Sequence, residues 1–294
     1  MALPLRNPAW RHAAWLPLAA LLLIGSALAQ AAEPDSAATL REHHAQLAPQ
    51  LERSPFQRPL KLESLEAGEQ VQGSVDAVVA QPFELAREHL QQPAAWCEIL
   101  MLHINTKQCT AAGNALDVRI GRKYDQPLAD AYRVAFAFQL QAATADYLSM
   151  RLSAENGPFS TRDYRIQLQA IPLEGGSKTF VHLRYAYGSG FTAKLAMQAY
   201  LATVGAGKVG FTRTAGASFI GGVRGAVERN TMRYYLAIDT YLASLATPAA
   251  QQRMQRLEAW FTATEQYARQ LHELDRAEYL AMKQNEFRRL PGAG

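Results

Sequence analysis

Six strand-like runs follow one another between positions 103 and 187, with strong alternation of apolar and polar residues in the third and fourth, and they constrain the fold more than any other feature of the chain. Alternation with a period of two is typical of strands that bury one face. Turn-forming residues separate several of the runs, at Gly113-Asn114, Asn156-Gly157-Pro158 and Glu174-Gly175-Gly176-Ser177. The predicted strands are His103–Thr110, Ala115–Arg122, Ala131–Leu140, Tyr147–Ala154, Tyr164–Ile171 and Thr179–Tyr187. The sequence therefore predicts an antiparallel meander whose apolar face must be covered by another element.

A long helix that can cover this face is predicted towards the C-terminal end, over Val223–Leu245. It follows Gly221-Gly222, contains no helix breaker, and places apolar side chains on one stripe at helical spacing. That stripe consists of Val223, Val227, Tyr234, Ile238, Tyr241 and Leu245. A new helix is expected after Thr247-Pro248, and helical sequence with an apolar seam extends to about Leu290.

The segment before the meander carries further strands and helices. Leu60 and Leu62 alternate with charged residues, and Val71–Val79 has the pattern of a longer strand. Pro82 and Pro93 are each placed to begin a short helix, because proline is favoured in the first turn.

Residues 30–58 are expected to form an N-terminal arm. Asp35 or Ser36 can cap a short helix there, with apolar positions Leu40, Leu47 and Leu51. The helix carries His43 and His44, which project about 100° apart, so that they cannot bind one metal ion together. We expect both histidines on the solvated surface. Breaks in the arm are expected at Pro49, Pro55 and Pro59.

This order of one strand, two short helices, six meandering strands and a long helix resembles the START-like, helix-grip superfamily. The residues that carry the resemblance are Val71–Val79 with Gln81-Pro82-Phe83-Glu84-Leu85 after it, Trp96 in the second short helix, Tyr187 at the end of the last strand, and Val223 at the start of the long helix. The resemblance covers about residues 60–245 and includes no diagnostic motif. It implies an apolar cavity between sheet and helix, where members bind lipids, sterols or polyketides and a minority carry out chemistry. Phe191–Ile220, inserted before the long helix, and the helices after it depart from this pattern.

We therefore predict an α+β fold in which a curved antiparallel sheet of about seven strands grips a long C-terminal helix, with extra helices at both ends. The predicted organisation is a leader at 1–29, the helical arm at 30–58, the START-like domain at 59–246 and a helical extension at 247–294.

The first 29 residues have the pattern of a secretory signal peptide. Arg6 and Arg11 precede the apolar run Ala13–Ile24, and small residues follow it, so cleavage is predicted after Ala29, with Ala31 as the alternative. The apolar run is shorter than the roughly 20 residues that a bilayer span needs, although an uncleaved anchor is the competing interpretation. The mature protein is therefore predicted to be periplasmic or secreted, with no transmembrane anchor after cleavage.

The charge of the chain argues against a nucleic-acid partner, and its two cysteines argue against a zinc site. The formal net charge of +4 falls by two when Arg6 and Arg11 leave with the leader, and no basic stripe is present, so no nucleic-acid partner is predicted. Cys97 and Cys109 are the only cysteines. In an oxidising compartment we expect them to form a disulfide, the alternative being two free buried thiols. Without a neighbouring pair of histidines they do not form a zinc site, and no metal or cofactor is predicted.

Gly205, Gly207 and Gly210 spell G-x-G-x-x-G, but their context does not support a nucleotide site. The preceding residues 193–204 have a helical pattern rather than that of a strand, and Val209 stands where a phosphate loop needs Ser or Thr. A plain connection or a flexible lid at the cavity mouth are the remaining interpretations of 191–220.

His103 and His182 both lie in predicted strands. A catalytic triad built from them with Asp130, Asp146 and Ser153 is not supported, because no nucleophile occupies a strand-to-helix turn. Each is expected to be a hydrogen-bonded strand histidine. His182 shares a strand face with Phe180 and Arg184, and we expect that face to point away from the core. The opposite orientation would place a cationic and a titratable group inside the cavity.

Amphipathic tyrosines on inward faces suit a ligand with an apolar body and few polar atoms. The predicted ligand-binding residues are Tyr132, Phe136, Leu148, Met150, Tyr234, Ile238 and Tyr241. We predict an exported binding protein for an apolar or amphipathic, lipid-like small molecule, and leave open a transient contact with a membrane surface. The alternatives are an enzyme of the same fold, such as a cyclase or hydrolase, and a structural envelope protein with a filled core. No catalytic residue is assigned.

Overall fold

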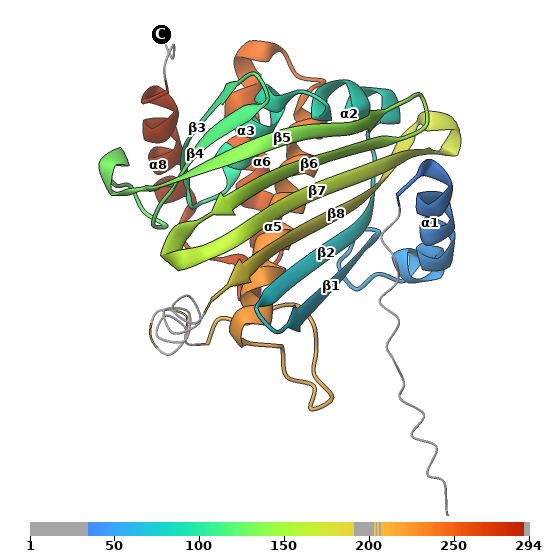
Figure 1. Ribbon diagram of the computed structural model, residues 1–294, viewed down its shortest axis with the longest axis horizontal. Coiled ribbons are helices and arrows are strands. Elements are labelled where there is room, and N and C mark those ends of the chain that lie inside the picture. Colours follow the sequence, from blue (N-terminus) through green and yellow to red (C-terminus); the bar gives the residue numbers. More distant parts are fainter. Residues whose placement is uncertain (1–34, 191–202, 204, 206, 291–294) are drawn as a thin grey trace, which may run out of the picture. The chain divides into compact units, whose positions relative to one another are not determined.

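A computed structural model describes residues 35–190, 203, 205 and 207–290 of the chain, so the leader and most of 191–206 lie outside the described residues. Its central element is one curved, antiparallel, eight-stranded sheet in the order β1-β2-β8-β7-β6-β5-β4-β3 (Figure 1). The strands are β1 Leu60–Ala67, β2 Gln70–Val79, β3 Thr106–Ala112, β4 Ala115–Ile120, β5 Tyr132–Ala143, β6 Leu148–Asn156, β7 Thr161–Leu173 and β8 Lys178–Ser189.

The sheet confirms the predicted meander and adds one strand to the expected number. β1 and β2 form a hairpin, and β2 then pairs with β8, the last strand of the chain. β1, where charged residues alternate with Leu60 and Leu62, is an edge strand of eight residues.

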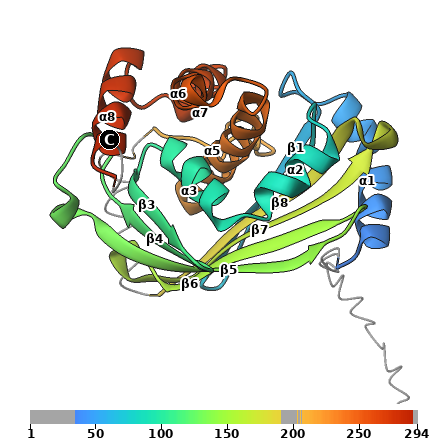
Figure 2. The same ribbon diagram turned by 90° about the horizontal axis from the view of Figure 1, so that it is seen from above.

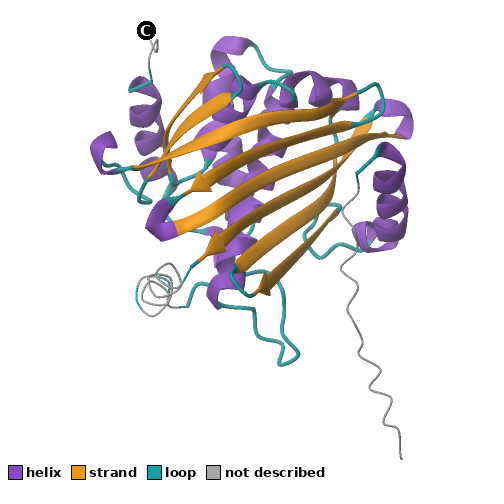
Figure 3. Cartoon of the chain, in the orientation of Figure 1, coloured by secondary structure: helices purple, strands orange, loops and turns teal. Residues whose placement is uncertain are grey.

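Helices lie on both faces of the sheet (Figures 2 and 3). The concave side faces α2 Phe83–Leu90, α3 Pro93–Leu102 and the long α5 Gly222–Ser244, with α6 Ala249–Glu265, α7 Ala268–Leu271 and α8 Arg276–Arg288 beyond them. α5 contacts β1, β2 and β8. The opposite face is partly covered by α1 Ala37–Glu52.

Two apolar cores result from this layering. The larger core lies between the concave face and α2, α3 and α5, and the alternating residues Val181, Leu183, Tyr185 and Tyr187 of β8 point into it. A smaller core lies on the other face, where α1 packs on the sheet through Leu40, Leu47, Leu51, Tyr147, Ile171 and Phe180. Because successive strand residues point to opposite faces, the alternation in β8 decides which core each side chain joins.

The ends of several helices differ from the predictions. Ser36 caps α1, but the helix continues through Pro49 and ends only at Glu52. His103 ends α3 with its N–H bonded to the Leu100 carbonyl, so this histidine is not in a strand. α6 is preceded by Pro248 rather than capped by Thr247.

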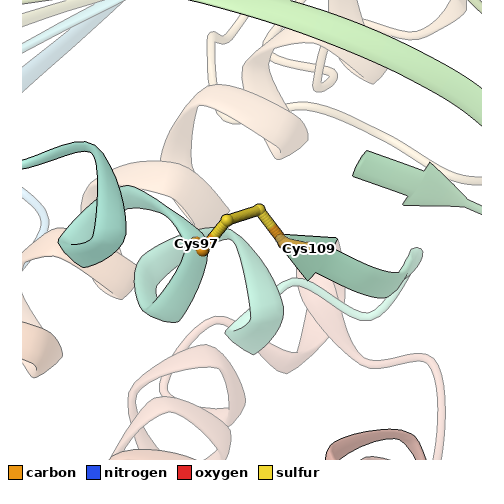
Figure 4. Close-up of a disulfide and its surroundings, with 2 residues drawn as sticks. All are labelled: Cys97 and Cys109. Atoms are coloured by element: carbon orange, nitrogen blue, oxygen red, sulfur yellow. A yellow bond between two sulfur atoms is a disulfide. The ribbon is translucent and has the colours of Figure 1, made fainter. Parts of the chain in front are cut away.

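Cys97 and Cys109 form the predicted disulfide, which ties α3 to β3 (Figure 4). Their Cα atoms are 5.1 Å apart, within the usual range for such a bridge. Among the described residues, no helix combines the length and the apolar character needed to cross a membrane.

Candidate functional site

A group of aromatic side chains lies between β8 and the middle of α5. The ring of Tyr234, on α5, lies 5.2 Å from that of Tyr185 on β8 and 5.0 Å from that of His103 at the end of α3. α5 comes close to the sheet here because β2 carries Gly73, where a Cβ would clash with the Thr231 hydroxyl of α5. Because Gly73 has no side chain, α5 can approach the sheet closely over the tyrosines.

Two further tyrosines extend this group along the sheet. Tyr164 on β7 stacks on Tyr187 of β8 with ring centroids 5.5 Å apart, and its hydroxyl is 2.7 Å from that of Thr161. Burial raises the pKa of Tyr185, Tyr187 and Tyr234 above the ordinary value of a phenol. These hydroxyl groups therefore stay neutral at physiological pH and can serve only as hydrogen-bonding groups.

His103 is the titratable group next to these tyrosines, and it is 4% exposed. Its pKa lies well below the ordinary value, chiefly because burial penalises the imidazolium, and Arg233 and Lys283 add to that effect. The ring is therefore neutral. Nδ1 accepts a hydrogen bond from the Asn105 N–H at 3.2 Å, which leaves the ring proton on Nε2.

The Nε2 atom of His103 is buried, and no hydrogen bond of good geometry reaches it within the described part of the chain. The side chain that interacts with it is Asn230, one turn before Tyr234 on α5, which acts as a hydrogen-bonding group on both His103 and Tyr185. His103, Asn230 and Tyr185 therefore form a small buried polar group within the apolar core.

The structure brings six of the seven predicted ligand-binding residues into the larger core. Phe136, Leu148, Met150, Ile238 and Tyr241 are at most 4% exposed, and Tyr234 packs against the same core. Tyr132 lies apart from them at the start of β5, where it is 46% exposed and packs on Phe159. The preceding turn Leu128–Asp130 brings the chain to the surface at this point, so the alternation of β5 does not bury its first residue.

Tyr241 belongs to a different neighbourhood from Tyr234. Its hydroxyl is 3.4 Å from His89 Nδ1, and the Arg256 guanidinium lies 4.3 Å from its ring centroid.

Sequence reasoning did not single out Asn230 or Asp76. Asn230 lies outside the apolar stripe of the long helix, and its neighbours come from distant segments. Asp76 was detectable as the one charged residue inside the apolar run Val75–Val79.

His182 is hydrogen-bonded, as predicted, and points with Phe180 to the face away from the larger core. The expectation that His43 and His44 lie on the solvated surface is wrong, because both are half-buried where α1 packs on Phe180 of the sheet.

The glycine-rich segment before α5 has no features of a nucleotide site among its described residues. Lys208 pairs with Glu273 at 3.0 Å. The backbone N–H groups of Phe211 and Thr212 donate to the buried Glu228 of α5, at 2.6 and 2.9 Å. These contacts hold residues 208–212 against α5 as a connection. Residues 191–202, 204 and 206 of this segment lie outside the described residues.

A surface groove of about 700 Å³ adjoins this connection. Its aromatic residues are Phe56, Phe211 and Tyr267, whose rings contact one another, together with Phe219. None of the predicted ligand-binding residues lines it. The groove is therefore a second candidate binding location, separate from the tyrosines between β8 and α5.

The element order that resembles the START-like superfamily is confirmed in the structure, from the strands before the two short helices to the long α5. No family model matches the sequence, and no curated protein does so either. Three solved structures illustrate what the fold is similar to.

Human StAR-related lipid transfer protein 5 has 10% identity and a TM-score of 0.34, over 71% of this chain and 98% of its own. Zhui aromatase/cyclase from Streptomyces sp. R1128 has 12% identity and a TM-score of 0.29, over 68% and 95%. A conserved protein from Geobacillus kaustophilus has 11% identity and a TM-score of 0.35, over 58% and 95%.

Proposed function

We propose that this protein is exported and binds an amphipathic, lipid-like small molecule between the concave face of the sheet and α5. The observation that carries the proposal is the group of buried polar side chains, His103 with Asn230 and Tyr185, that lies beside the ring of Tyr234 within the apolar core. An acceptor atom of a ligand, such as a carboxylate or carbonyl oxygen, would accept a hydrogen bond from the Nε2–H of His103. Asn230 and Tyr185 offer further hydrogen-bonding groups next to it.

The apolar body of the ligand is assigned to the predicted residues on the same side of the sheet. Phe136, Leu148, Met150 and Ile238 offer only carbon and sulfur atoms, while Tyr234 and Tyr241 add hydroxyl groups. Tyr132, being exposed, is assigned to the outer end of this surface. An apolar surface with few polar groups is the usual composition of a small-molecule site.

Binding is favoured over catalysis because the side chains around His103 do not form an acid–base pair. Its neighbours Tyr185 and Tyr234 have a raised pKa, and His103 itself has a lowered pKa, so neither exchanges protons readily near pH 7. A general acid and base would need pKa values near the working pH.

The test is a fluorescence titration with cis-parinaric acid, an apolar chain that ends in a carboxylate. Wild-type protein is expected to bind it, and Ile238→Phe, which fills the space beside α5, to abolish binding. His103→Phe keeps a ring on Tyr234 but removes the donor, and should weaken binding about tenfold or more, since a hydrogen bond to a charged group contributes about 1.5–3 kcal/mol. His272→Phe, at an exposed histidine, is the matched control and should bind like the wild type.

Phe211→Ala, in the surface groove, separates the two locations. If it abolishes binding while Ile238→Phe does not, the ligand occupies the groove and the proposed site is wrong. If the wild type binds nothing, and both Val227→Phe and Ile238→Phe destabilise the protein by the roughly 1–3 kcal/mol typical of overpacking, the core is filled and the protein is structural.

A further inference from the structure

Two histidines and an aspartate converge on the opposite face of the sheet, under α1. Asp76 of β2 lies directly across from His182 of β8 in the register of the two strands, and both side chains point towards α1. His43 reaches down from α1, which places three potential metal ligands from three distant segments together. His43 Nε2, Asp76 Oδ1 and His182 Nδ1 all lie within 4.8 Å of one another.

We infer that His43, Asp76 and His182 form a binding site for a divalent transition-metal ion, with Zn²⁺ as the best fit. Two imidazole nitrogens and one carboxylate oxygen are a donor set that zinc commonly uses, with further positions left for water or another ligand. This inference is independent of the proposed function, because the site lies on the other side of the sheet from His103.

The distances are close to those that zinc requires. His43 Nε2 and His182 Nδ1 are 2.9 and 2.7 Å from the same oxygen of Asp76. Ligand atoms at about 2.0–2.2 Å from a tetrahedral zinc ion lie roughly 3.3 Å from each other. The donors therefore need to separate by only about half an ångström. Rotation of His43, whose side chain is 27% exposed, can provide this movement.

The charge state also suits a cation. The side chain of Asp76 is only 3% exposed, and within the described ranges its ion-pair partners are His43 and His182 rather than Lys or Arg. Although burial opposes it, the hydrogen bonds from both histidines lower the pKa of Asp76 to about 2. A buried carboxylate whose ion-pair partners in the described part of the chain are two imidazole rings supplies a negative charge that a metal ion can balance.

The surroundings explain how the ion would enter and what it would do. Lys61 and Glu63 of β1 are the other charged groups that act on His43, and they pair with each other at 2.8 Å. The exposed side of His43 opens to solvent, whereas His182 is closed off at 10% exposure of its side chain. Since α1 packs on the sheet through only a small apolar core, a metal ion held by His43 would fasten it to β2 and β8.

The experiment is a zinc titration of chelator-stripped protein against a chromophoric competing chelator, with Zn²⁺ alone as the ligand. Wild-type protein should bind one equivalent, and its melting temperature should rise with zinc. His43→Gln should bind at least about tenfold more weakly, since even the loss of an outer-shell partner costs about 10–100-fold. His44→Gln, the neighbouring half-buried histidine on the same helix, is the matched control and should bind like the wild type.

Cobalt provides a second measurement that does not depend on stability. Co²⁺ should give visible absorption bands with the wild type and with His44→Gln, and should lose them with Asp76→Asn, which preserves the shape of the side chain. The inference is wrong if wild-type protein binds no zinc, in which case the three residues are only a hydrogen-bonded group. It is equally wrong if His43→Gln and Asp76→Asn both bind zinc as the wild type does.

Discussion

The substitution Glu286→Gln tests a group of charges that is buried completely. Glu286 of α8 accepts from Lys107 Nζ of β3 and from Lys283 Nζ of its own helix, both at 2.8 Å, and all three side chains are 0% exposed. Lys283 also donates to the carbonyl oxygens of His103 and Thr106. These bonds fasten the C-terminal helix to the segment that connects α3 with β3.

We expect Glu286→Gln to lower the free energy of unfolding by about 3–5 kcal/mol at pH 7, because it leaves two ammonium groups buried without a counter-charge. Urea unfolding at constant m-value, with the disulfide intact, measures the loss. The control is Glu258→Gln, which breaks the exposed pair with Arg276 and should cost less than about 1 kcal/mol.

The pH dependence gives a second, independent check. Burial lowers the pKa of Lys283 from 10.5 to about 8, despite the attraction of Glu286. Between these two values the unfolded chain binds more protons than the folded chain, so the free energy of unfolding of the wild type should rise as the pH increases from about 8 to 10.5. In Glu286→Gln, Lys283 loses the attraction that opposes its deprotonation, so its pKa falls further and the deficit relative to the wild type should shrink as the pH rises through about 8. A loss below 1 kcal/mol at pH 7, or one that grows towards pH 10, would refute the reasoning.

Two further predictions concern the state of the protein in the cell. Denatured protein from its own host should show almost no reaction with a thiol reagent before reduction, and Cys97→Ala/Cys109→Ala should be less stable by about 3 kcal/mol, from the entropy of a loop of this length. Two labelled thiols per chain would contradict the pairing. Intact mass of protein from the periplasm should lack about 29 residues, the length of the predicted leader. Full-length protein in the membrane fraction would show instead that the leader is an anchor.

The sequence alone predicted most of the backbone architecture. Period-two alternation and turn residues located the strands from β3 to β8, and the breaker-free stretch after Gly222 located α5. These patterns are local, because the pleat of a strand and the turn of a helix repeat within a few residues. The alternation within β8 also indicated that His182 and Arg184 face away from the larger core, since Tyr185 and Tyr187 occupy the other side.

Only the tertiary structure decided which polar side chains meet. Along the chain, the residues of most strands of the sheet lie between His43 and His182. Both histidines nevertheless contact Asp76, because α1 crosses the outer face where β2 pairs with β8. Likewise, Lys107 and Glu286 form a buried pair that no local pattern could indicate. Local sequence patterns indicate which elements form, but the partner of a buried charge depends on how distant elements pack, and that is a property of the assembled fold.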